Sequence, residues 1–162
     1  MENLLKILGA EKRGVPGTAM NGISVIKEFL SRASIDTAKL VLADGSGVSR
    51  YNLTSADMIV QLLQAMSKDP GHFETFYNSL PIAGVDGSLS NRMKGSTAQG
   101  NLHAKTGTLS GVSALSGYVR TADGELLAFS MLMQNFTTAS WPYRLVQDAI
   151  GVFLSGLRRE SL

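Results

Sequence analysis

The sequence predicts an α+β fold in which helices come first and an antiparallel sheet with a packed last helix comes second. In the first half of the chain, apolar residues recur three or four positions apart, as on one face of a helix. In the second half, three apolar segments have the length of strands, and a strongly striped helical pattern follows them. Helices followed by neighbouring strands are typical of α+β proteins.

The first half is expected to hold four helices and one short extended segment. Apolar spacing predicts the helices, and a proline, which cannot continue a helix, follows the fourth. These are Leu4–Leu8, Gly22–Ser31, Met58–Met66 and Phe73–Leu80, with Lys39–Ala43 as a candidate strand between the second and third.

The second half begins with a loop at 84–101, which is rich in Gly, Ser, Asn and Thr. Three strands are then expected, with Asp123-Gly124 as the turn between the last two. The strands are Leu102–Thr106, Val112–Thr121 and Leu126–Gln134. They should pair antiparallel in consecutive order, and the apolar stripe of a helix at about Trp141–Leu157 should pack across one face.

Composition describes an ordinary globular protein of one domain. The chain has 162 residues, of which 44% are hydrophobic and 17% charged. A net charge of +2 from scattered side chains gives no footprint for nucleic acid, and the lack of cysteine excludes disulfides and thiolate metal sites. No apolar run approaches the roughly 20 residues that span a bilayer, and the first residues do not resemble a signal peptide.

The strongest chemical signal is Lys105-Thr106-Gly107 on the first predicted strand. Chance predicts roughly 0.05 such triplets in this composition. A lysine charge beside a threonine hydroxyl suits a substrate carboxylate, and a glycine lets a substrate backbone lie against the strand edge. The triplet is also compatible with an exposed lysine before a turn glycine.

Three linked strings place the triplet in a family context. They are ADGSGVSRYNL at Ala43–Leu53, LPIAGVDGSLSNR at Leu80–Arg92 and AKTGTLSGV at Ala104–Val112. Together they resemble the C-terminal region of class C low-molecular-mass penicillin-binding proteins, which are D-alanyl-D-alanine carboxypeptidases/endopeptidases that trim peptidoglycan in the periplasm or cell wall. The resemblance implies the β-lactamase/transpeptidase-like fold of penicillin-recognising serine peptidases, here incomplete. Its parts would be a helical portion at 1–83, the loop at 84–101, and the sheet with its helix at 102–162.

The same resemblance implies roles for the triplet and its neighbour. Lys105 and Thr106, next to Gly107, would hold the terminal carboxylate of a peptidoglycan stem peptide ending in D-Ala-D-Ala. The backbone N–H of Thr108 would form half of an oxyanion hole. β-Lactams would bind the full-length protein, and no cofactor, metal or nucleic acid is expected.

The family's other two catalytic elements are not found. Ser24-Val25-Ile26-Lys27 matches Ser-x-x-Lys, but chance predicts roughly 0.8 such matches, and the pair is interpreted as a solvated helix face. No Ser-x-Asn occurs where the family has it. We therefore expect a C-terminal fragment that lacks the nucleophile, and an isolated chain that neither hydrolyses D-Ala-D-Ala peptides nor is labelled by penicillin.

Other polar residues have structural interpretations. The turn-rich segment Asp44–Asn52 is read as a folded loop that supports the site, with direct substrate contact as the alternative. Asp86 and Arg92 are candidates for a buried ion pair. His103 is placed as a flank of the groove on the lysine's strand face, and His72 as an exposed helix residue. Two isolated histidines without clustered partners are not expected to form a metal site.

Trp141 and Tyr143 are interpreted as core or anchor aromatics of the last helix.

Two other classes of function remain open at the level of sequence. One is a non-catalytic peptidoglycan-binding or interaction domain that kept the Lys-Thr-Gly strand without the nucleophile. The other is a nucleotide-binding module, for which the glycine-rich loops supply no phosphate-binding motif.

Overall fold

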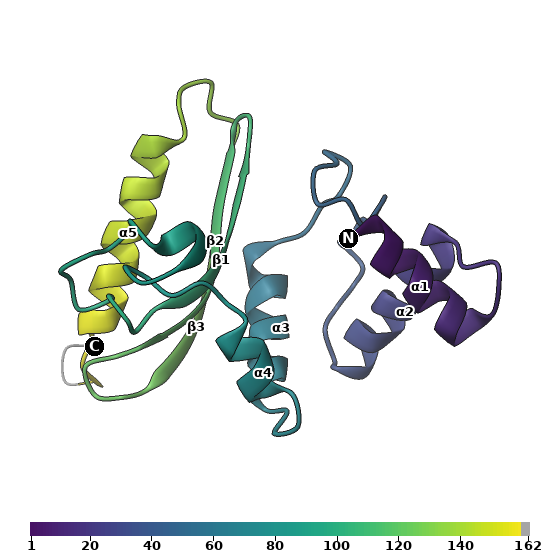
Figure 1. Cartoon of the computed structure of the whole chain (residues 1–162), viewed down its shortest axis with the longest axis horizontal. Helices are drawn as coiled ribbons and strands as arrows, with labels where there is room; N and C mark the ends of the chain where they lie inside the picture. The colour runs from purple at the N-terminus through teal and green to yellow at the C-terminus, as the bar shows by residue number, and fades with distance from the viewer. Residues whose placement is uncertain (160–162) are drawn as a thin grey trace. The chain divides into compact units, whose positions relative to one another are not determined.

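A computed structural model describes residues 1–159, and it confirms the α+β class (Figure 1). By contact the chain divides into two compact units, Met1–Leu62 and Leu63–Leu162, a division that no composition shift in the sequence marks. The elements in chain order are α1 (Glu2–Arg13), α2 (Ala19–Arg32), α3 (Ala56–Ser67), α4 (Phe73–Asn78), the 3-10 turn η1 (Gly87–Leu89), β1 (His103–Leu109), β2 (Val112–Arg120), β3 (Leu126–Gln134) and α5 (Trp141–Gly156).

The first unit is built on the packing of α1 against α2. α1 has Glu2 in its first turn and basic residues in its last, which suits the helix dipole. The Thr18 side chain caps α2 by accepting a hydrogen bond from the backbone N–H of Asn21. The helices touch at Gly22, where a Cβ would lie 2.1 Å from the backbone oxygen of Leu5, so any larger residue would force them apart.

The second unit is a three-stranded antiparallel sheet in the order β1-β2-β3, with helices on both faces. Lys105 of β1 lies opposite Ser116 of β2, which lies opposite Ser130 of β3. Gly117 allows this close pairing, because a Cβ there would lie 2.1 Å from the backbone oxygen of His103. Figure 1 shows α4 on one side of the sheet and α5 on the other.

An aromatic cluster joins α4 to its face of the sheet. Tyr118 of β2 is fully buried, and its ring meets that of Phe73 edge-on with centroids 5.4 Å apart. The Tyr118 hydroxyl donates a 2.7 Å hydrogen bond to the backbone oxygen of Leu63, and burial raises the pKa of this hydroxyl to about 12. This face is therefore held by packed rings and one buried hydrogen bond.

The other face of the sheet carries the main apolar core, which joins the sheet, the 84–101 loop and α5. Its buried members are Ala83, Leu89, Met93, Ala98, Leu102, Ala104, Leu115, Val119 and Phe129. Val152 and Leu154 of α5 pack against this core while staying partly exposed. The 84–101 segment thus forms part of the core although its sequence is that of a loop.

The predicted elements are confirmed in kind, with shifts at their ends. The bounds of β3 agree fully, β1 is longer than expected at its C-terminal end, and the turn at Asp123-Gly124 is present. The candidate strand at Lys39–Ala43 was wrong, because that segment makes only a single bridge from Val41 to Leu53. No helix within residues 1–159 has the length and apolar character needed to cross a membrane.

The expected packing of α5 was wrong in its choice of face. α5 does lie across the sheet, in contact with β2. However, its buried residues are Gln147, Gly151 and Ser155, whereas Trp141 is exposed. The apolar stripe therefore does not face the sheet, and Trp141 is not a core residue. Tyr143 stacks on Phe136 with ring centroids 3.9 Å apart.

Candidate active site

The four predicted site residues lie in a row on β1. Side chains alternate along a strand, so Lys105 and Gly107 share one face while Thr106 and Thr108 share the other. Lys105, Gly107 and Thr108 are exposed, and Thr106 is half-buried. The Lys105 Nζ donates a 2.7 Å hydrogen bond to the backbone oxygen of Thr106, and within residues 1–159 no carboxylate forms an ion pair with it.

β1 is an edge strand along most of its length. The segment before it runs beside its first residues, where Ile82 bridges His103 and the Ala104 N–H donates to the Pro81 oxygen at 2.9 Å. Beyond Ala104, no backbone of the described residues pairs with the outer side of the strand. An extended peptide can therefore add to this edge by backbone hydrogen bonds, next to the lysine and the threonine hydroxyl.

The loop places a second hydroxyl at the site. η1 packs beside β1, and the Thr106 Oγ1 donates a 2.8 Å hydrogen bond to the Ser88 Oγ. While this bond is present, the Ser88 hydroxyl hydrogen stays available to a carboxylate, and rotation of the Thr106 hydroxyl would make a second donor available beside the lysine charge. Sequence reasoning gave Ser88 no role, because the contact spans eighteen residues and no local pattern signals it.

His103 is not a flank of an open groove, contrary to the expectation. It is 8% exposed, and its ring stacks on Tyr77 with centroids 4.1 Å apart. Burial lowers its pKa, against weaker opposite effects of the Tyr77 backbone oxygen and the Asp86 charge. A neutral, packed imidazole has a structural role here. His72, by contrast, is exposed as predicted and pairs with Asp69.

Ser24 and Lys27 lie on α2 in the first unit, among polar neighbours. The Ser24 Oγ accepts a 3.4 Å hydrogen bond from Arg13, which also pairs with Glu28. Among the hydrogen bonds of the described residues, none joins Ser24 to Lys27. This environment supports the interpretation of the Ser-x-x-Lys match as a polar helix face.

Hydrogen bonds made by the side chain of its last residue, Asn52, hold the Asp44–Asn52 segment together, in agreement with its interpretation as a folded loop. The Asn52 side chain accepts from the Ala43 N–H at 2.7 Å and donates to the Asp44 carboxylate at 3.0 Å. A hydrogen bond from Ser46 is the largest influence lowering the pKa of Asp44. The Gly45 N–H donates to Glu2 at 2.7 Å, which ties the loop to α1.

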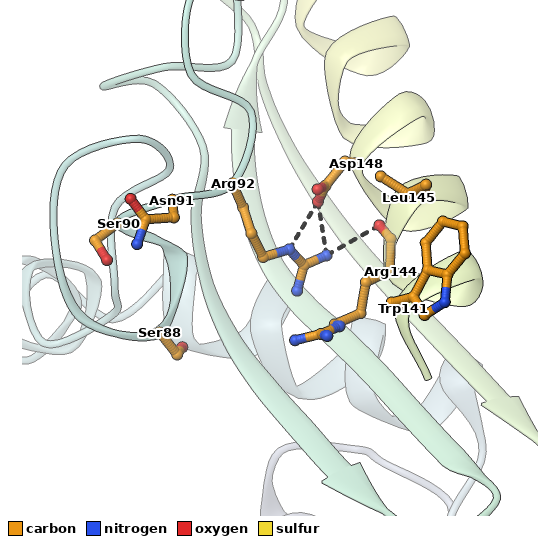
Figure 2. A pocket seen from close by; sticks show the side chains of 8 residues that line it. All are labelled: Ser88, Ser90, Asn91, Arg92, Trp141, Arg144, Leu145 and Asp148. Carbon is orange, nitrogen blue, oxygen red and sulfur yellow. Dashed lines mark hydrogen bonds and ion pairs between the residues drawn. The ribbon is translucent and has the colours of Figure 1, made fainter. Parts of the chain in front are cut away.

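The expected pair of Asp86 and Arg92 was wrong. Asp86 instead accepts a 2.7 Å hydrogen bond from the backbone N–H of Ile82. Arg92 pairs with Asp148 of α5 at 2.7 Å, and their side chains are 11% and 19% exposed (Figure 2). Arg92 also donates to Gln147, whose amide donates to Ser113 of β2. A polar network therefore fixes α5 and the loop to the sheet.

A pocket of about 410 Å³ opens beside this network. Figure 2 shows Arg92 at its centre, with Asp148 and the backbone oxygen of Arg144 as partners. The remaining lining residues are Ser88, Ser90, Asn91, Trp141 and Leu145. Of these, Ser88 is bonded to a predicted site residue, Thr106, so the pocket adjoins the β1 site without containing it.

No group of three potential metal ligands gathers within the described part of the chain. The arrangement on β1 instead offers charge, hydroxyl donors and an open strand edge. An arrangement of this kind can bind an extended peptide with a carboxylate terminus.

Comparisons with known proteins show what the chain as a whole is similar to. The chain is 48% identical over 159 residues to the D-alanyl-D-alanine carboxypeptidase of Actinomadura sp. (strain R39). That match covers 95% of this chain and 29% of the relative. A second relative is the D-alanyl-D-alanine carboxypeptidase DacB of Haemophilus influenzae, 34% identical over 125 residues, with 76% of this chain and 26% of the relative covered. The chain thus spans less than a third of these relatives.

Solved structures give the same assignment. Penicillin-binding protein 4 (dacB) from Haemophilus influenzae, in complex with a β-lactam, matches with a TM-score of 0.87 and 27% identity, over 96% of this chain and 38% of that chain. An extended-spectrum β-lactamase matches with a TM-score of 0.62 and 17% identity, over 91% of this chain and 61% of that chain, which shows the shared fold. The family profile described as D-Ala-D-Ala carboxypeptidase 3 (S13) matches residues 1–156. The chain belongs to the D-Ala-D-Ala carboxypeptidase 3 (S13) family.

Proposed function

We propose that this chain supplies the carboxylate-binding part of the active site of a serine-type D-Ala-D-Ala carboxypeptidase that processes peptidoglycan outside the cytoplasm. The observation that carries the proposal is the row Lys105–Thr108 on an open strand edge, exposed except for half-buried Thr106, in a chain that belongs to the carboxypeptidase family. β-Lactams, one of which is bound in the Haemophilus structure, would occupy the same site.

In this function the substrate peptide lies along β1. The Lys105 ammonium and the Thr106 hydroxyl bind the terminal carboxylate of D-Ala-D-Ala by charge-assisted hydrogen bonds, and Ser88 adds a further hydroxyl. Gly107 has no side chain to hold the peptide away from the strand. The N–H of Thr108 donates to the oxygen that becomes negative when the peptide carbonyl is attacked.

Attack on that carbonyl needs a serine whose proton is taken by a nearby base. No serine of this chain is assigned as the nucleophile, because Ser24 is hydrogen-bonded to Arg13 and not to Lys27. Carboxypeptidase activity is proposed for a longer protein, in which an acyl-serine forms, D-alanine leaves and water releases the peptide. The isolated chain is expected to remain unlabelled by penicillin.

Substitution of Lys105 tests this assignment. In a longer family protein that contains these residues, Lys105→Ala should lower kcat/KM for a D-Ala-D-Ala peptide by more than about tenfold, or roughly 1.4 kcal/mol. The reason is that the substrate carboxylate loses its charged partner. Lys12→Ala, which removes an exposed lysine from α1, is the matched control. Equal turnover of the two variants would refute the role of Lys105.

A further inference from the structure

The segment that precedes β1 folds back beside that strand and is attached to it at two points. Near the start of the segment, the backbone oxygen of Pro81 accepts a 2.9 Å hydrogen bond from the Ala104 N–H. Near its other end, the Ser88 Oγ accepts the 2.8 Å hydrogen bond from Thr106. Because both points lie on the same strand, the fold of the residues between Pro81 and Ser88 decides whether the serine hydroxyl reaches Thr106.

Asp86 closes the turn between these two points. Its Oδ1 accepts a 2.7 Å hydrogen bond from the Ile82 N–H, and its own N–H donates to the Ile82 oxygen at 3.2 Å. The Val85 N–H donates to the same oxygen at 3.1 Å. Both backbone groups of Ile82 are therefore bonded across the turn, and the Asp86 carboxylate is the partner of the N–H. A side-chain oxygen that bonds a nearby backbone N–H is a usual way to fix a turn.

The residue after Ser88 anchors the turn in the core. Leu89 is fully buried, its N–H donates to the Asp86 oxygen at 3.2 Å, and its oxygen accepts from the Gly84 N–H at 3.0 Å. Ser88 therefore lies between a turn held by Asp86 and a side chain held in the core. All these contacts are internal to the second unit, so they do not depend on which surfaces of the chain are open.

The charge of Asp86 argues against direct binding of a carboxylate by this residue. Asp86 is exposed and lies two residues before Ser88, so its negative charge repels a carboxylate that approaches the serine. What Asp86 contributes is therefore its hydrogen-bond acceptor, which holds the turn. Asparagine has the same acceptor without the charge, so substitution by asparagine separates the two properties.

We propose that Asp86 is a positioning residue of the carboxylate site on β1. The bond from Ile82 holds the turn closed, and the closed turn holds the Ser88 hydroxyl against Thr106. This pair of hydroxyls then presents donors to the terminal carboxylate of a peptide. Asp86 acts through Ser88 and does not itself contact the peptide. The effect on peptide binding rests on the function proposed above, whereas the placement of Ser88 against Thr106 does not.

NMR three-bond couplings of Thr106, which report its rotamer about the Cα–Cβ bond, test the placement without a ligand. The unchanged chain should show one rotamer, in which the hydroxyl is bonded to Ser88. Asp86→Ala and Ser88→Ala should both shift the couplings toward an average of rotamers, because Thr106 loses its acceptor. Asp86→Asn should keep the couplings, as should the matched control Asp69→Ala, which removes a carboxylate that accepts from the Gly71 N–H in another turn. Averaged couplings in the unchanged chain, or couplings that Asp86→Ala does not alter, would overturn the proposal.

Peptide binding tests the consequence for the site. Titration with a peptide that ends in D-Ala-D-Ala and has a free carboxylate, followed by the backbone amide signal of Thr108, gives a dissociation constant for each variant. Asp86→Ala and Ser88→Ala should each raise this constant about tenfold, as expected for the loss of one hydrogen bond to a charged group. The variant with both changes should bind no more weakly than either, because Asp86 acts through Ser88. Asp86→Asn should bind no more weakly than the unchanged chain.

The double variant separates a positioning role from a general loss of structure. Losses that add in the double variant, or an Asp86→Asn variant as weak as Asp86→Ala, would show that Asp86 does not act through Ser88 by its acceptor. Absence of peptide binding by the unchanged chain would instead refute the proposed function. The Thr106 couplings would then decide the placement of Ser88 by themselves.

Discussion

His103 and Lys105 share one face of β1, but their surroundings differ. Lys105 is exposed beyond the end of the aromatic cluster, whereas His103 is covered by Tyr77. Strand alternation alone, which the sequence shows, cannot separate these two environments. What separates them is Tyr77 of α4, whose ring stacks on His103. The role of Lys105 therefore stays a prediction, whereas the placement of His103 beside an open groove was wrong.

The buried histidine makes stability depend on pH. Burial lowers the pKa of His103 in the folded state, so the unfolded chain takes up a proton first as pH falls below about 6.5. Above that pH the contribution of His103 is fully present, and below it the free energy of unfolding decreases. Urea unfolding followed by the fluorescence of Trp141, the only tryptophan, should show this decrease between about pH 7.5 and about pH 5.

The His103→Gln variant should lose part of that pH dependence, whereas His72→Gln, at an exposed position, should keep it. Equal pH profiles for the two variants would contradict a buried, neutral His103.

At the scale of elements, α5 shows most clearly what a sequence pattern leaves open. Its apolar period predicted a helix of the observed type, and the helix begins at Trp141 as expected. The pattern did not reveal that Gln147 and Ser155 face the sheet, because their partners Ser113 and Thr97 lie 34 and 58 residues earlier in the chain. Long-range polar contacts override local amphipathicity here.

The ion pair between Arg92 and Asp148 is the main polar contact of α5. Asp148→Ala leaves the Arg92 guanidinium, 11% exposed, without a counter-charge, and should lower the free energy of unfolding by about 3 kcal/mol. Glu125→Ala, which removes the partner of exposed Arg159, should change it little. Chemical denaturation followed by Trp141 fluorescence measures the free energy of unfolding of both variants. Equal losses would show that the Arg92–Asp148 pair contributes no more to stability than the exposed pair.

At the scale of the whole molecule, the sequence predicted the fold class, the order of the elements and the family. The Lys105-Thr106-Gly107 triplet and the two accompanying strings carried that information because they are local in the chain. The contact of Ser88 with Thr106 and the division at Leu62 depend on how distant segments meet, which no local pattern encodes. Membership of the carboxypeptidase family confirms the resemblance, whereas the individual roles on β1 stay predictions.

The most direct test of the central claim is an NMR titration of the isotopically labelled chain with two peptides that end in D-Ala-D-Ala, one with a free carboxylate and one amidated. The free peptide should shift the backbone amide signals of Thr106, Gly107 and Thr108, and the amidated peptide should not, because Lys105 and Thr106 would bind the carboxylate. Lys105→Ala should abolish the shifts. Equal shifts with both peptides, or shifts that survive in Lys105→Ala, would contradict a carboxylate site on β1.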